Sequence, residues 1–138
     1  MKLEEIIAVT GKPGLFKIIT QGANSVIVES LTDNKRFPIN AMHNISVLEN
    51  IAIYTYEEEV PLKLVFKSIA EKYEGKEAIS HKESNKNLVA FFTEILPNYD
   101  DERVYPSNIK KVVQWYNLLA QNNFDFSSIS EDEETEQA

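Results

Sequence analysis

The chain has 138 residues, enough for one ordinary domain or two very small ones, and its hydrophobic and charged fractions are typical of a soluble globular protein. It contains no cysteine, which excludes disulfides, thiolate metal sites and a cysteine nucleophile. The formal net charge of −8 argues against general nucleic-acid binding. The start of the chain is too acidic for a signal peptide, and no apolar run is long enough to cross a bilayer. We therefore expect a cytoplasmic protein that does not associate with membranes.

The first 56 residues are typical of short strands separated by turns. Residues 3–9 fit either a short helix or a strand, and Pro38 belongs on an edge strand or at a bulge because it cannot donate to a ladder. Strands rich in β-branched and aromatic residues are expected over residues 15–20, 25–31, 36–39 and 51–56. Short strands with such turns predict a meander that curls into a small SH3-like β-barrel over residues 1–58.

The second half changes to helical spacing. Pro61 suits the first turn of a helix that ends near Gly75. A second helix begins at either Ser80 or Ser84 and stops at Pro97, and a third opens near Pro106. These helices predict a three-helix domain over residues 59–126, so the expected fold class is α+β.

The last segment, residues 127–138, carries five acidic residues and no basic one. It has a single large apolar residue, so it is expected to be a disordered acidic tail. Such a tail either aids solubility or competes for a basic patch on the same chain.

No motif predicts catalysis, a cofactor or a metal. His43 and His81 lack partners at ligand spacing, and residues 11–14 do not open a helix as a phosphate loop would. The acidic run at residues 100–102 lacks the alternation and the glycine of a calcium loop. We therefore expect a protein that is not an enzyme and holds no cofactor.

Basic and aromatic residues of the first half form one candidate interaction surface, in or beside turns at the strand ends. The residues are Lys12, Phe16, Lys17, Lys35 and Arg36. On a small barrel such residues can stack on bases and neutralise phosphates, or form a groove for a peptide. They can equally be ordinary barrel surface.

The third helix and the loop before it hold a second candidate surface. Its residues are Arg103, Tyr105, Lys111 and Trp115. Trp115 and Leu118 give this helix a second apolar face beside its main stripe. That face packs either against the barrel or against a partner, which is a second copy of the chain or a foreign protein.

Several segments resemble an uncharacterised family of small bacterial proteins. They are residues 96–111, 115–117, 11–17, 28–31 and 35–38. The resemblance covers roughly residues 3–120 and implies a cytosolic bacterial protein with a small N-terminal domain and a helical C-terminal one. The family has no assigned activity, so no residue role carries over.

The expected function is that of a non-enzymatic protein-interaction module whose partner is an unidentified protein or a second copy. The alternative is a nucleic-acid-binding accessory protein that uses Lys12, Phe16, Lys17, Lys35 and Arg36. The negative net charge of the chain disfavours this hypothesis.

Overall fold

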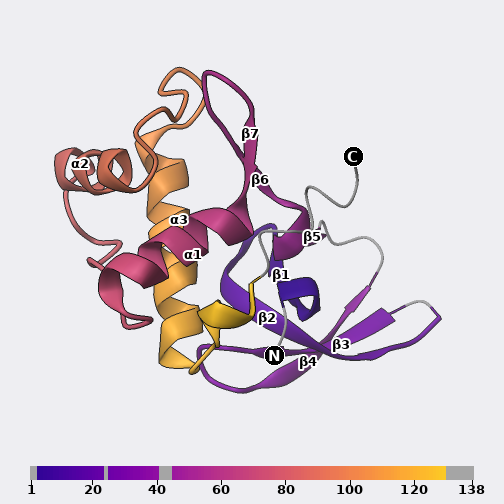
Figure 1. The fold of residues 1–138 in the computed structure, drawn as a ribbon. Coiled ribbons are helices and arrows are strands. Elements are labelled where there is room, and N and C mark those ends of the chain that lie inside the picture. The colour runs from indigo at the N-terminus through magenta and orange to yellow at the C-terminus, as the bar shows by residue number, and fades with distance from the viewer. Residues whose placement is uncertain (1–2, 24, 41–44, 130–138) are drawn as a thin grey trace.

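The computed structural model describes residues 3–23, 25–40 and 45–129, which form an α+β protein. One sheet has five strands and a second has two. Figure 1 shows the main sheet at the lower right, the helices at the left, and the two-stranded hairpin rising at the top of the view. The predicted fold class is therefore confirmed at the level of α+β. His43 lies outside the described residues.

The main sheet is antiparallel, with the strand order β4-β3-β2-β1-β5. A short 3₁₀ turn, Leu3–Glu5, precedes it, so the N-terminal segment contains both of the expected alternatives, a helical turn and a strand. Pro38 lies on β4, an edge strand, as its missing N–H predicts. The strands are β1 (Ile6–Val9), β2 (Lys12–Gln21), β3 (Ser25–Ser30), β4 (Arg36–Asn40) and β5 (Ile45–Val47).

The sheet curls around a small core of its own without closing. Its buried residues come from four strands: Ile7, Val9, Phe16, Val28 and Ile39. In the described part of the chain, however, β4 pairs only with β3 and β5 only with β1. The described residues therefore form no closed barrel, and the predicted SH3-like barrel is not confirmed.

The strand expected over residues 51–56 does not join the main sheet. A 3₁₀ turn, Leu48–Asn50, separates it from β5, and it forms β6 (Ala52–Tyr54). This strand pairs with β7 (Glu59–Pro61) in a separate hairpin. The prediction that residues 51–56 complete a barrel is wrong because their partner is the next segment of the chain.

The three helices are α1 (Leu62–Tyr73), α2 (Asn85–Ile95) and α3 (Pro106–Gln121). Pro61 precedes α1, and a left-handed Glu74 and Gly75 end it. Of the two serines, Ser84 begins α2, because its side chain accepts the Asn87 N–H at 3.2 Å. No helix in the described ranges is long and apolar enough to span a membrane.

One main core joins the sheet to the helices. Leu15 of β2 and Leu31 share it with large helical side chains such as Phe66 and Phe92. The core also includes Ile129, only 6% exposed, whose carbonyl accepts the Lys67 Nζ at 3.2 Å. The predicted disorder from residue 127 is therefore wrong as far as residue 129, and residues 130–138 lie outside the described part.

Candidate interaction groove

Helix α3 lies across the start of β2, where Leu118 comes into contact range of Gly14. Gly14 has a φ of +86°, and a Cβ added there would lie 3.6 Å from the Leu118 Cδ1 and 3.2 Å from the Thr32 Oγ1. One turn further along α3, the Asn122 Nδ2 donates to the Leu31 carbonyl at 3.1 Å. The second apolar face of α3 thus packs on the N-terminal sheet through Leu118, while Trp115 is half-buried.

A line of three neighbouring cavities, of about 250, 370 and 420 Å³, runs beside α3. The first and second share Ile51, Lys111 and Trp115, and the second and third share Lys12, Gly14 and Gln114. We call this line of cavities the α3 groove. It brings together the two candidate surfaces that the sequence analysis treated separately.

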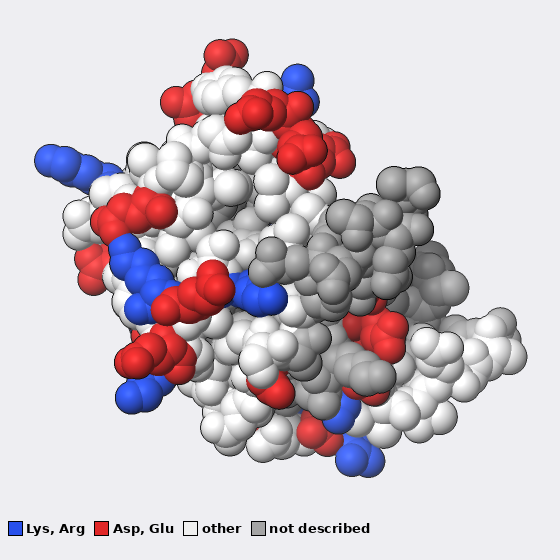
Figure 2. Space-filling model, in the orientation of Figure 1, with Lys and Arg blue, Asp and Glu red and all other residues white. Residues whose placement is uncertain are grey.

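The charged side chains that line the α3 groove are mostly cationic. Within the described part of the chain they are Lys12, Lys35, Arg103 and Lys111, with Asp33 as the one acid in the lining. The charge of the groove lining is therefore positive, although the chain as a whole has a net charge of −8. Figure 2 shows acidic side chains gathered instead at the top of the molecule, over the region where Figure 1 places the hairpin and the loop before α3.

At the β2 end of the groove a lysine lies over an aromatic pair. The Lys12 Nζ is 5.0 Å from the centroid of the Phe37 ring, a cation–π distance. Phe37 in turn packs edge-to-face with Phe16, with their ring centroids 5.4 Å apart. Phe16 lies in the middle of β2 and is 4% exposed, so it supports Phe37 from inside the sheet.

Three candidate residues lie outside the groove lining. The Arg36 Nε pairs with the Glu29 Oε1 at 2.9 Å, and Lys17 stands opposite Glu29 in the β2–β3 register. Tyr105 is exposed at the start of α3, where its backbone N–H donates to the Asn108 Oδ1 at 2.8 Å.

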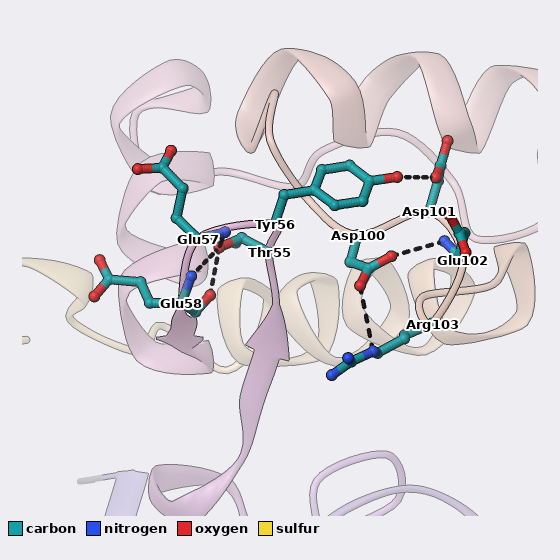
Figure 3. Close-up of polar contacts among 8 residues, drawn as sticks. All are labelled: Thr55, Tyr56, Glu57, Glu58, Asp100, Asp101, Glu102 and Arg103. Carbon is teal, nitrogen blue, oxygen red and sulfur yellow. Dashed lines mark hydrogen bonds and ion pairs between the residues drawn. The ribbon is translucent and has the colours of Figure 1, made fainter.

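At the other end, Arg103 is held over β6 by the loop before α3. Asp100 is buried, and its two carboxylate oxygens contact the Arg103 Nε at 3.3 Å and the Glu102 N–H at 3.0 Å (Figure 3). The guanidinium carbon lies 5.1 Å from the centroid of the Tyr54 ring. Arg103 is thus positioned while most of its side chain stays exposed to solvent.

The tip of the β6–β7 hairpin is tied to the same loop. The Thr55 Oγ1 accepts the N–H groups of Glu57 at 3.2 Å and Glu58 at 2.9 Å, which shapes the tip (Figure 3). The Tyr56 hydroxyl donates to Asp101, and this hydrogen bond raises the pKa of Tyr56. Despite these carboxylates, the described residues contain no group of three or more side chains that could hold a metal ion.

Phe37, Tyr54 and Gln114 also line the groove, although none of them is among the residues predicted from the sequence. Phe37 follows Arg36 directly, and Gln114 lies one helical turn from Lys111, so spacing alone could have suggested both. Tyr54 alternates with Ile53 on β6, but only the three-dimensional fold places it near Arg103.

Replacing Gly14 with alanine is expected to lower the free energy of unfolding by about 2–3 kcal/mol, because a side chain there is strained at positive φ and crowds Thr32. The matched control is Gly11→Ala, which has a similar φ of +87° but no atom within 4 Å of the added Cβ. It should cost about 1 kcal/mol. Urea denaturation of both variants measures the difference, and equal losses would contradict the crowding of residue 14 by Thr32.

Two family models match the chain. Residues 3–48 match the family described as Domain of unknown function (DUF5606), and residues 51–119 match Domain of unknown function (DUF6852). No match was found among curated proteins.

A solved structure is also similar. It is a solution NMR structure of a protein from Bacteroides vulgatus that is 43% identical, with a TM-score of 0.73. The match covers 90% of this chain and 89% of that one. These findings confirm the predicted resemblance to an uncharacterised family. The chain belongs to the family described as Domain of unknown function (DUF6852), with the DUF5606 match ahead of it.

Proposed function

We propose that this protein is a non-enzymatic interaction module that binds an extended acidic segment of a partner protein in the α3 groove. The observation that carries the proposal is the meeting of two separate basic clusters in one groove, with Lys12 and Lys111 facing the same cavity. A carboxylate-bearing segment complements that charge, and the half-buried Trp115 offers it an apolar contact.

A protein segment fits the groove better than a nucleic acid does. The hypothesis of nucleic-acid binding requires exposed aromatic rings on which bases can stack, but Phe16 is buried inside the sheet. Phe37 is already covered by Lys12. The acidic side chains at the hairpin tip and the net charge of −8 repel an anionic ligand. This repulsion is stronger for a long polyanion such as a nucleic acid than for a short acidic peptide.

The test uses a fluorescein-labelled decapeptide of alternating glutamate and valine, with fluorescence anisotropy as the readout. We expect saturable binding at low salt that weakens as the ionic strength rises. The double variant Lys12→Glu/Lys111→Glu should bind at least about tenfold more weakly, because two attractions become repulsions.

The matched control carries the same charge change outside the groove, at Lys86 of α2 and Lys110, the exposed neighbour of Lys111. Lys86→Glu/Lys110→Glu should bind the peptide within about twofold of the unmodified protein. Equal losses in the two double variants would overturn the groove as the site. Absence of peptide binding, or tighter binding of a ten-nucleotide oligothymidylate, would overturn the proposed function.

A further inference from the structure

The hairpin hydrogen bonds determine which way the backbone groups of β6 point. The Leu62 N–H donates to the Ile51 carbonyl at 2.8 Å, and the Thr55 N–H donates to the Glu58 carbonyl at 3.0 Å. Because peptide groups alternate in direction along a strand, the odd-numbered residues of this segment face β7. The N–H and C=O groups of Ala52 and Tyr54 therefore face the opposite side.

That opposite side borders the 250 Å³ cavity of the α3 groove, which Ala52 and Tyr54 both line. The Tyr54 carbonyl accepts the Asp100 N–H at 2.9 Å. Within the described residues, the Tyr54 N–H and both backbone groups of Ala52 have no hydrogen-bond partner. A strand edge with such groups is a template for pairing with another chain.

The chain itself occupies the first part of a third strand position beside β6. The Tyr56 N–H donates to the Asn98 carbonyl at 3.0 Å, and Thr55 and Tyr99 form an antiparallel bridge. The loop then turns away, because the Asp100 carbonyl accepts the Val104 N–H at 2.8 Å. Residues 98–100 thus occupy the third strand position opposite residues 54–56. Further along, opposite Ala52, the same position opens into the cavity.

We propose that the acidic partner segment binds by strand addition: it extends this third strand beyond Asp100 and hydrogen-bonds to the backbone N–H and C=O of Ala52. The inference rests on the proposed function and specifies the conformation of the bound segment. Among the described residues, Arg103 and Lys111 are the charged ones in the lining of this cavity. In an extended segment, alternate side chains point the same way, so acidic residues at every second position meet these cations while the backbone pairs with β6.

The test is Ala52→Pro, which removes one N–H from the groove edge. Ile51 has the extended conformation that a following proline requires (φ −85°, ψ 140°), and the Ala52 N–H is not used by the hairpin. The matched control, Glu59→Pro, puts the same ring on β7, where the N–H of residue 59 points away from β6. We expect Ala52→Pro to weaken binding of the glutamate–valine peptide about tenfold and Glu59→Pro to leave it within about twofold.

A second measurement needs no substitution. On addition of the peptide to the unmodified protein, amide hydrogen exchange at Ala52 should slow, while exchange at Glu59 stays unchanged. If the peptide binds and Lys12→Glu/Lys111→Glu weakens it, but Ala52→Pro and amide exchange show no effect, strand addition is wrong and the proposed function stands. If the peptide does not bind the unmodified protein, both are wrong.

Discussion

Replacing Leu15 with alanine is expected to lower the free energy of unfolding of the whole chain by about 2–5 kcal/mol, the usual cost of removing a fully buried leucine side chain. Leu15 is on β2, yet it belongs to the core that contains Phe66 of α1 and Ile109 of α3. The cavity left by the smaller residue therefore removes contacts that join the sheet to the helices.

Urea denaturation measures this loss with two probes. Far-UV circular dichroism reports mainly the helices, and the fluorescence of Trp115, the single tryptophan, reports the junction of α3 with the sheet. Both transitions should shift together, because one core connects the two parts. Thr20→Ala, at an exposed position of the same strand, is the control and should change stability by less than about 0.5 kcal/mol. A helical transition that does not move in Leu15→Ala would contradict a shared core.

The helices could be predicted because their signals are local. Pro61, Ser84 and Pro106 mark the three starts, and the apolar spacing between them fits one buried face per helix. The strand at residues 51–56 was equally visible, but its partner was not. Pairing depends on the 3₁₀ turn before it, which directs the segment away from the main sheet.

The residues of the groove could be predicted only as two separate surfaces, one in the N-terminal strands and one on the third helix. Lys12 and Lys111 are far apart in sequence, and their meeting depends on the approach of α3 to β2 at Gly14. Phe16 is predicted near the start of a strand, whereas β2 begins at Lys12 and places Phe16 mid-strand, where it belongs to the small core of the sheet. Ile129 was missed because an average over an acidic segment hides one well-placed apolar side chain.

The protein is expected to lose stability between about pH 10 and pH 12 through Tyr116. Its side chain is fully buried, and its hydroxyl donates to the Lys76 carbonyl at 2.7 Å. Burial raises the pKa of Tyr116 to about 12, while a tyrosine in the unfolded chain ionises near pH 10. Below pH 10 both states are protonated and stability is retained. Above it the unfolded state loses its proton first, so stability falls by about 1.4 kcal/mol per pH unit, about 2.7 kcal/mol in all.

Tyr116→Phe tests this dependence, because phenylalanine cannot ionise. At neutral pH the variant should be less stable by about 1 kcal/mol, since the Lys76 carbonyl loses its hydrogen bond. Above pH 10 the difference should shrink and then reverse, because only the original protein loses the Tyr116 contribution. Urea midpoints of both proteins across this range give the comparison, with the exposed Tyr105→Phe as the control for a lost phenol. A difference between Tyr116→Phe and the original protein that stays constant above pH 10 would show that Tyr116 ionises equally in both states. The buried hydroxyl would then not account for the alkaline loss of stability.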